Sequence, residues 1–272
     1  MLYLVATPIG NLGDITLRAI ETMRACDAIY CEDTRRTAQL LNRLGIEKPL
    51  VSCHTHNERM RSEEIAALLR EGKEICYVSD AGMPAVSDPG AVLVRMCVEN
   101  GLSFTVVPGA SAVLTAAVLS GLPPQPFAFF GFLPREAKPR REALDRIAAT
   151  DYLCILYESP HRVRDTLQEL FDRLGNVQGA VLRELTKKFE SVYRGSLTEL
   201  IDRFAEEPKG ECVIAVLPGP KSEAEPDPGK LLDALLETMS VRDAAAVASE
   251  KLHIPKKQAY ALALERKAAQ ER

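Results

Sequence analysis

Three loops rich in small residues carry the groups that could do chemistry in this chain of 272 residues. They are TPIGNLGD from Thr7, SDAGMPAVSDPG from Ser79 and PGASA from Pro108, and each follows a short apolar run. Small residues let a backbone approach a ligand closely. The carboxylate of Asp80 and the hydroxyls of Ser79 and Ser111 suit a ligand with an adenine, a ribose and an amino-acid end. Because tight turns also contain Gly and Pro, a purely structural role is the alternative.

Motifs of several other chemistries are missing from the sequence. Neither GxxxxGK[ST] nor GxGxxG occurs, which disfavours an enzyme that binds nucleotide phosphates. GASAV around Ser111 lacks the closing glycine of a nucleophile elbow, so a helix N-cap is the alternative for this serine. His54 and His56 have an HxH spacing without a third ligand, and we expect no metal site.

The composition predicts a cytoplasmic protein that folds by itself. Hydrophobic residues make up 46% of the chain, and the formal net charge of −4 argues against nucleic-acid binding by the whole surface. The seven cysteines form no CxxC pair, which indicates buried thiols in a reducing compartment. The first ten residues show neither a basic leader nor a membrane-spanning run. Because the net charge is negative, any contact with a nucleic acid must be local.

Alternating strand and helix patterns predict how the loops are positioned. Short β-branched runs and amphipathic segments alternate through residues 1–120, as in a parallel sheet, whose ligands bind beyond the carboxyl ends of the strands. The proline-rich run at 121–127 marks the start of a second α/β domain with a mixed sheet, over 121–217. An acidic linker at 218–229 leads to a helical domain at 230–272.

The helical domain has a pattern of its own. Its last two helical segments are joined by the short turn HIP, which resembles a helix-turn-helix unit, and the second of them opens with Lys256 and Lys257. From residue 251 onward there are six basic residues and two acidic ones. We expect this domain to help hold a nucleic acid. A helical cap or a dimer contact is the alternative, and the basic stretch 135–146 is a second candidate surface.

Taken in order, the motifs resemble a known family. The segments are VATPIGNLGDITLRAIETMRACDAIYCEDTRRT, HTHNE, YVSDAGMPAVSDPG, VVPGASA, FFGFLPR, YESPHRV and RELTKKFESVYRGS. They are similar to the ribosomal RNA (cytidine-2′-O)-methyltransferase branch of the tetrapyrrole methylases, over nearly all of residues 1–217. Relatives that make tetrapyrroles carry a VGxGPGD-like first loop and a shorter second loop, which disfavours a porphyrin substrate.

The resemblance implies an α/β fold with two domains, a cofactor cleft between them, and the small all-helical C-terminal domain. It further implies S-adenosylmethionine as cofactor and 2′-O-methylation of a cytidine in 16S ribosomal RNA of the small ribosomal subunit, without a metal. A tetrapyrrole or diphthine methyltransferase is one alternative, and an RNA-binding protein without catalysis is another. The family resembled is usually paired, so a homodimer is expected.

The resemblance also implies roles for single residues. For the cofactor these are Pro8, Ile9, Asp80, Ala81, Met83, Ser111, Ala112, Tyr157, Glu158, Leu185 and Thr186. For the RNA they are His56, Asn57, Glu58, His161, Lys188, Lys256 and Lys257. A ribose hydroxyl is a poor nucleophile, so a group must take or orient its proton. Lys187 is the leading candidate, with Glu184 beside it, because a desolvated lysine can accept the proton or stabilise charge on the oxygen. Contact of Lys187 with RNA phosphates alone is the alternative.

Overall fold

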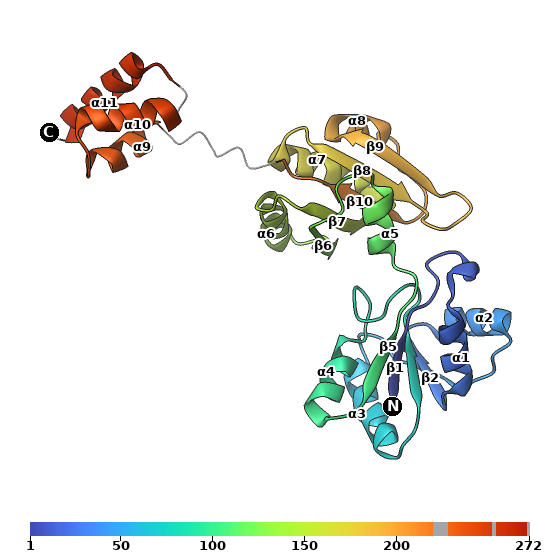
Figure 1. Cartoon of the computed structure of the whole chain (residues 1–272). Helices are drawn as coiled ribbons and strands as arrows, with labels where there is room; N and C mark the ends of the chain where they lie inside the picture. Colours follow the sequence, from blue (N-terminus) through green and yellow to red (C-terminus); the bar gives the residue numbers. More distant parts are fainter. Residues whose placement is uncertain (220–227, 252–253, 271–272) are drawn as a thin grey trace. The chain divides into compact units, whose positions relative to one another are not determined.

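The computed structural model describes residues 1–219, 228–251 and 254–270. The chain forms two compact units, Met1–Pro218 and Gly219–Arg272. Among the described residues, the first unit contains two five-stranded sheets and the second contains three α-helices (Figure 1). Most of the linker expected at 218–229 lies outside the described residues, and helix α9 begins at Pro228.

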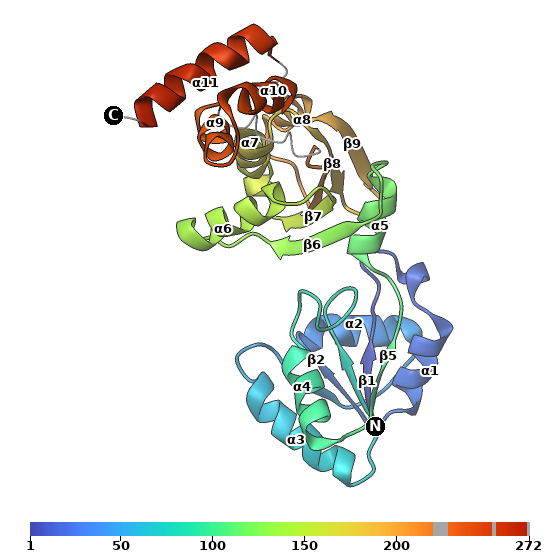
Figure 2. The ribbon, with the colours of Figure 1, turned by 60° about the vertical axis from the view of Figure 1, so that its left-hand side comes forward.

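The first sheet is parallel throughout and has the strand order β3-β2-β4-β1-β5. Its central strand β4, ICYV, is buried along its whole length, as expected of a strand covered on both faces. Helices α3 and α4 cover one face and α1 and α2 the other (Figures 1 and 2). Because the strands are parallel, the loops after β1, β4 and β5 all lie at one edge of the sheet. The elements are β1 (Leu2–Val5), η1 (Leu12–Asp14), α1 (Leu17–Ala25), β2 (Ala28–Cys31), α2 (Thr34–Leu44), β3 (Leu50–Ser52), α3 (Glu58–Arg70), β4 (Ile75–Val78), α4 (Ala91–Asn100) and β5 (Phe104–Val107).

The second sheet has mixed directions, as the sequence predicts, and the strand order β6-β7-β10-β8-β9. Strands β6 and β7 are parallel, whereas the pairs β7–β10, β10–β8 and β8–β9 are antiparallel. The elements that belong to it are β6 (Phe127–Phe132), α6 (Ala137–Ala148), β7 (Leu153–Glu158), η2 (Pro160–Arg162), α7 (Val163–Leu174), β8 (Gln178–Arg183), β9 (Ser191–Ser196), α8 (Leu197–Arg203) and β10 (Cys212–Val216).

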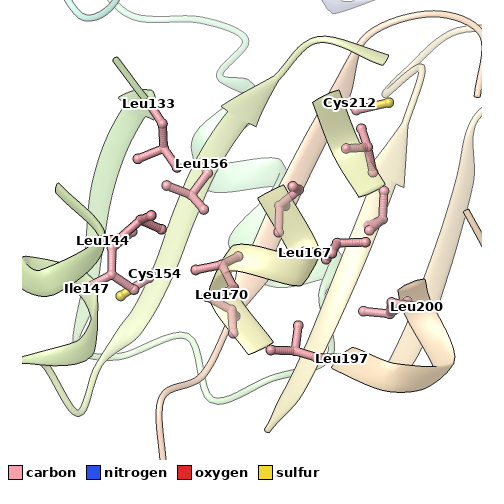
Figure 3. Close-up of a cluster of buried hydrophobic side chains, with 14 of the residues drawn as sticks. Leu133, Leu144, Ile147, Cys154, Leu156, Leu167, Leu170, Leu197, Leu200 and Cys212 are labelled. Carbon is pink, nitrogen blue, oxygen red and sulfur yellow. The ribbon is translucent and has the colours of Figure 1, made fainter. Parts of the chain in front are cut away.

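Both faces of the second sheet are covered. Helices α6, α7 and α8 bury leucines on one face, among them Leu144, Leu167 and Leu197 (Figure 3). Helix α5 (Ala112–Leu119) covers the other face, where its residues Val113 and Ala116 are buried. The sequence places α5 at the end of the first domain, but this helix packs against β7 and β10 of the second sheet. The chain therefore passes to the second sheet before the proline-rich run.

The second unit is a bundle of α9 (Pro228–Leu236), α10 (Val241–Lys251) and α11 (Lys256–Gln270). Its buried core consists of Leu232, Ala245, Ala248, Ala259 and Ala263. A two-pronged ion pair between Arg266 and Asp233, with N···O distances of 3.1 and 2.6 Å, joins α11 to α9. Arg266 thus serves the bundle itself, although it contributes to the basic excess of the tail.

Two further expectations concern the whole chain. All seven cysteines are buried and none forms a disulfide, as predicted. Among the described residues, no helix is both long and apolar enough to cross a membrane.

Candidate active site

A cavity of about 670 Å³ lies where loops of both sheets meet within the first unit. Small-molecule sites typically measure about 300–1,000 Å³. The first sheet supplies the loops after β1, β4 and β5, which are the three loops of small residues. The second supplies the ends of β6 and β7, the turn after β8 and the start of β10. The sequence-predicted cleft is therefore present.

Most residues predicted to hold the cofactor line this cavity. They are Ile9, Ala81, Met83, Ser111, Ala112, Tyr157 and Glu158, and the two predicted catalytic residues, Lys187 and Glu184, line it as well. Pro8, Asp80, Leu185 and Thr186 do not line the cavity that the described residues form. Leu185 is instead buried in the core between α5 and the second sheet.

Ser111 has two functions in this geometry. Its side chain accepts a weak hydrogen bond of 3.4 Å from the backbone N–H of Leu114, which makes it the N-cap of α5. The same residue lines the cavity. Its hydroxyl proton is free to face a ligand, because an N-cap side chain only accepts a hydrogen bond.

Asp80 faces away from the cavity. Its Oδ1 accepts a hydrogen bond from the backbone N–H of Asp33 at 3.1 Å, and its Oδ2 pairs with Arg36 at 3.0 Å. The side chain therefore fastens the loop after β4 to the start of α2. The protein itself thus supplies the partners that a half-buried carboxylate needs, and contact of Asp80 with the cofactor stays a prediction.

Glu158, at the end of β7, is held by a chain of hydrogen bonds that begins at the surface. Its Oε2 accepts a bond of 2.7 Å from the hydroxyl of Thr166, and that hydroxyl accepts one of 2.8 Å from Arg140. Its Oε1 accepts a bond of 2.9 Å from the backbone N–H of Ser159. Glu158 is 2% exposed and Thr166 is fully buried. The carboxylate is thus fixed in one orientation at the cavity wall.

Lys187 is an ammonium held between two carboxylates. Its Nζ lies 2.9 Å from both Glu184 Oε1 and Glu211 Oε2, while Glu184 Oε1 also accepts the backbone N–H of Glu211 at 2.9 Å. Burial works to lower the pKa of Lys187, but the hydrogen bonds to Glu211 and Glu184 outweigh it, and the pKa is raised. The hydrogen bond from Lys187 lowers the pKa of Glu184. Of the two roles predicted for Lys187, stabilising charge therefore fits this site and accepting a proton does not.

The turn that carries Lys187 has an unusual backbone. Glu184 and Thr186 have φ values of 52° and 66°, in the left-handed region that side chains other than glycine rarely adopt. The loop after β1 packs against this turn, since a Cβ at Gly10 would lie 2.4 Å from Lys187 Cγ and 2.9 Å from Thr186 Oγ1. Gly10 is therefore needed for the close approach of the two loops.

Glu58, predicted to contact RNA, is buried. It is 6% exposed, and its Oε1 accepts the backbone N–H groups of Gly90 and Val92 at 2.7 and 3.3 Å. A carboxylate at this place satisfies the free N–H groups of the first turn of α4 and interacts favourably with the helix dipole. These bonds give Glu58 a structural function beside the cavity loop, and its contact with RNA stays a prediction.

The other residues predicted to contact RNA are more accessible than Glu58. Asn57 bonds within its own loop, to His54 and Ser52. His161 is 73% exposed and pairs with Glu207. The remaining exposed residues are His56, Lys188, Lys256 and Lys257. Their contact with RNA stays a prediction.

Asp88, Phe132 and Glu211 are among the cavity residues that sequence reasoning missed. A signal for Asp88 was present, because SDAGMPAVSDPG contains two Ser-Asp pairs and only the first was selected. Phe132 is 60% exposed although it lines the cavity, and its ring packs edge-on against Tyr157 with centroids 5.6 Å apart. Glu211 could not be found from spacing, since only the fold brings it to Lys187.

Among the described residues, no group of three or more His, Cys, Asp or Glu side chains is arranged to hold a metal ion. Comparison with known proteins adds to this geometry. Residues 1–201 match the family described as Tetrapyrrole (Corrin/Porphyrin) Methylases. The chain belongs to the tetrapyrrole methylase family. Residues 222–267 match a second family, the RsmI C-terminal HTH domain.

Relatives of this tetrapyrrole methylase carry a common name. The "Ribosomal RNA small subunit methyltransferase I" of Halalkalibacterium halodurans is 48% identical, covering 82% of this chain and 78% of the relative. The protein of the same name from Haemophilus influenzae is 41% identical, covering 97% and 96%. Among solved structures, a diphthine synthase has a TM-score of 0.62 at 16% identity, covering 79% of this chain and 88% of that one. The last likeness supports the fold alone.

Proposed function

We propose that this tetrapyrrole methylase transfers a methyl group from S-adenosylmethionine to the 2′-hydroxyl of a cytidine ribose in 16S ribosomal RNA. One observation carries the proposal: a relative named as a small-subunit ribosomal RNA methyltransferase is 41% identical over almost the whole chain, tail included. The alternative, a diphthine methyltransferase, rests on a protein that shares the fold at only 16% identity.

The cavity suits S-adenosylmethionine in size and in lining. Apolar walls come from Ile9, Met83, Ala112 and Tyr157, while Ser111 and Glu158 offer a hydroxyl and a fixed carboxylate for polar groups. An apolar cavity with a few placed polar groups is typical of small-molecule sites. When bound there, S-adenosylmethionine supplies a methyl group on a positively charged sulfur.

The protein's own contribution is placement and charge. Alignment of a nucleophile with a methyl group lowers the barrier chiefly because the reactants lose their translational and rotational entropy on binding, before the reaction. Glu184 and Glu211 hold the Lys187 ammonium at the cavity, where it can stabilise negative charge on a ribose oxygen or a neighbouring phosphate. For this function Lys187 does not need to accept a proton.

The helical unit is proposed to bind ribosomal RNA. Lys256 and Lys257 open helix α11 and are exposed, which suits phosphate contacts. A chain that ends before Pro228 should bind S-adenosylmethionine as before and methylate the subunit poorly. Replacing Lys256 and Lys257 by alanine should reduce the slope of log affinity against log salt by roughly one unit per lost contact. Lys267→Ala, near the end of the same helix, is the matched control. Unchanged methylation by the truncated chain at physiological salt would leave the unit as a cap or dimer contact.

A homodimer in the cytoplasm is also proposed. Leu114 and Val118 are one helical turn apart on α5 and are 57% and 74% exposed, which gives an apolar stripe suited to self-association. Sedimentation at micromolar concentration should show a dimer. A monomer would remove this part of the proposal.

Two measurements test the activity. Calorimetry should show binding of S-adenosylmethionine and of its demethylated product; binding of ATP or NAD instead would contradict the cofactor assignment. Labelled methyl groups should enter small ribosomal subunits that lack the modification. Transfer to uroporphyrinogen or to an elongation factor would favour the alternative substrates, and no transfer to any acceptor would favour an RNA-binding protein without catalysis.

A further inference from the structure

Four carboxylates line the cavity, and they differ in their partners. Glu158 lies 3.6 Å from an arginine, and Glu184 and Glu211 each lie 2.9 Å from Lys187. Asp88 also lines the cavity, but within the described part of the chain it forms no ion pair with a lysine or arginine. Asp88 is therefore the cavity carboxylate whose charge is not already neutralised by the protein.

The surroundings of Asp88 are acidic or neutral. Burial raises the pKa of Asp88 and the nearby Asp80 raises it further, while a hydrogen bond with the Ser79 side chain opposes the change. The ionisable groups that face it are Glu32, Tyr77, Asp80 and Tyr157. Burial, with repulsion from Asp80 and Asp88, likewise raises the pKa of Glu32. A carboxylate with this environment is a stronger base than an exposed one.

A capping function does not account for Asp88. Only Pro89 and Gly90 separate Asp88 from helix α4, so the carboxylate lies near the free N–H groups of the first turn, which an acidic side chain often satisfies. Glu58 already accepts hydrogen bonds from the backbone N–H groups of Gly90 and Val92. Glu58 of α3 thus satisfies the N-terminus of α4, and Asp88 lines the cavity wall without a capping function.

Asp88 also lies on the accessible side of the cavity. A Cβ placed on Gly131 would lie 3.9 Å from Ser87 Oγ, so the Ser87–Asp88 segment runs beside the end of β6. The next residue of β6 is the exposed Phe132, and Val86 of the same loop is 54% exposed. Other residues of the lining, such as Val113, are buried. A macromolecular substrate must enter from the exposed side.

We propose that Asp88 accepts the proton of the target ribose hydroxyl, an inference that rests on the proposed function. The 2′-oxygen forms a bond to the methyl carbon as the bond from that carbon to the sulfonium sulfur breaks. The electron pair of the broken bond stays on sulfur, which becomes a neutral thioether, and the hydroxyl proton moves to an Asp88 oxygen. Lys187, which stays protonated, complements this step by stabilising charge and does not compete for the proton.

The test is single-turnover methyl transfer to small ribosomal subunits, with enzyme in excess and S-adenosylmethionine saturating, between pH 5 and pH 9. Asp88→Asn should slow transfer by about 10²- to 10⁴-fold, the usual contribution of a general base. Its affinity for S-adenosylmethionine and its thermal unfolding should change little. Asp88→Glu should recover part of the rate, because it restores a carboxylate.

The pH profile separates catalysis from a structural effect. The wild-type rate should rise with pH through the pKa of Asp88, and this rise should be absent in Asp88→Asn. Glu32→Gln is the matched control: it removes a neighbouring negative charge without touching the cavity lining. This variant should keep both the plateau rate and the pH at which the rate rises, because burial and Asp80, rather than Glu32, raise the pKa of Asp88.

The outcomes are distinct. If the wild-type protein transfers no methyl group to the subunit, the proposed function fails and this inference fails with it. If the wild type is active and Asp88→Asn is within threefold of its rate, Asp88 is not the proton acceptor. Loss of S-adenosylmethionine affinity in proportion to the rate would also overturn the inference, because Asp88 would then be a binding residue.

Discussion

Replacing Thr166 by valine tests the hydrogen-bond chain behind the cavity. The buried hydroxyl of Thr166 donates to Glu158 Oε2 at 2.7 Å and accepts from Arg140 at 2.8 Å. Valine has nearly the same shape but can make neither bond. The substitution therefore breaks the link between Arg140 and the Glu158 carboxylate, which is 2% exposed. It does so without creating a large cavity.

The expected magnitude follows from what each partner retains. A hydrogen bond to a charged group contributes about 1.5–3 kcal/mol. Arg140 still has a bond of 2.7 Å to Glu169, and Glu158 still accepts the N–H of Ser159 at 2.9 Å, so neither group is left without a partner. We therefore expect Thr166→Val to lower the free energy of unfolding by about 2–4 kcal/mol, less than two full bonds to charged groups. Thr166→Ser, which keeps the hydroxyl, should lose only about 1 kcal/mol for its missing methyl.

Urea denaturation of the full chain, followed by circular dichroism, measures these differences. A double-mutant cycle with Glu158→Gln isolates the coupling between Thr166 and the carboxylate, which should exceed about 1 kcal/mol for residues in direct contact. Affinity for S-adenosylmethionine should fall as well, because Glu158 lines the cavity. If Thr166→Val unfolds within 0.5 kcal/mol of the wild type, roughly the size of a neutral surface change, the chain does not hold Glu158.

Three more predictions follow from the cavity. Gly10→Ala should destabilise the protein by about 1–3 kcal/mol and slow methyl transfer, because its Cβ would overlap Lys187 and Thr186; equal unfolding curves and rates would contradict the close approach. Phe132→Leu should raise the KM for the ribosomal subunit by about 5- to 100-fold, the contribution of one base stacked on an aromatic ring. In that experiment the affinity for S-adenosylmethionine should not change, and Phe127→Leu, at the start of the same strand, is the control. A lower affinity for S-adenosylmethionine in Phe132→Leu would show that Phe132 stacks on the cofactor instead. Lys187→Met should be less stable than the wild type at pH 7–9, and denaturation curves should show the difference shrink as pH rises through the raised lysine pKa, above about 10.4; a constant difference would mean that the ion pairs do not stabilise the fold.

The sequence predicted the architecture well, because periodic patterns report directly on burial. The fully buried β4 reads as ICYV, and the loops after β1, β4 and β5 were expected at the carboxyl edge of one sheet, where they form part of the cavity. The assignment of α5 was less accurate. Seven of its eight residues are apolar and they lie on every side of the helix, so the pattern shows neither which face is buried nor which sheet the helix covers.

Single side chains at the site were harder to predict. Asp80 and Asp88 both follow a serine in the same loop, and only the folded backbone shows that Asp80 turns to Arg36 while Asp88 lines the cavity. Glu58 was predicted to contact RNA because of the resemblance of its segment to the family, and its burial against the N-terminus of α4 was not visible in the sequence. Lys187 was chosen correctly as a cavity residue, yet its two carboxylate partners lie 3 and 24 positions away, so the raised pKa was not visible in the sequence.

The most direct test of the account identifies the methylated nucleoside. Small ribosomal subunits that lack the modification are incubated with the protein and labelled S-adenosylmethionine, and their 16S RNA is digested to nucleosides for mass spectrometry. The account predicts that the label appears in 2′-O-methylcytidine, and that it appears far more slowly with Asp88→Asn. Label on a nucleobase, on another ribose or on a protein of the subunit would contradict the central claim.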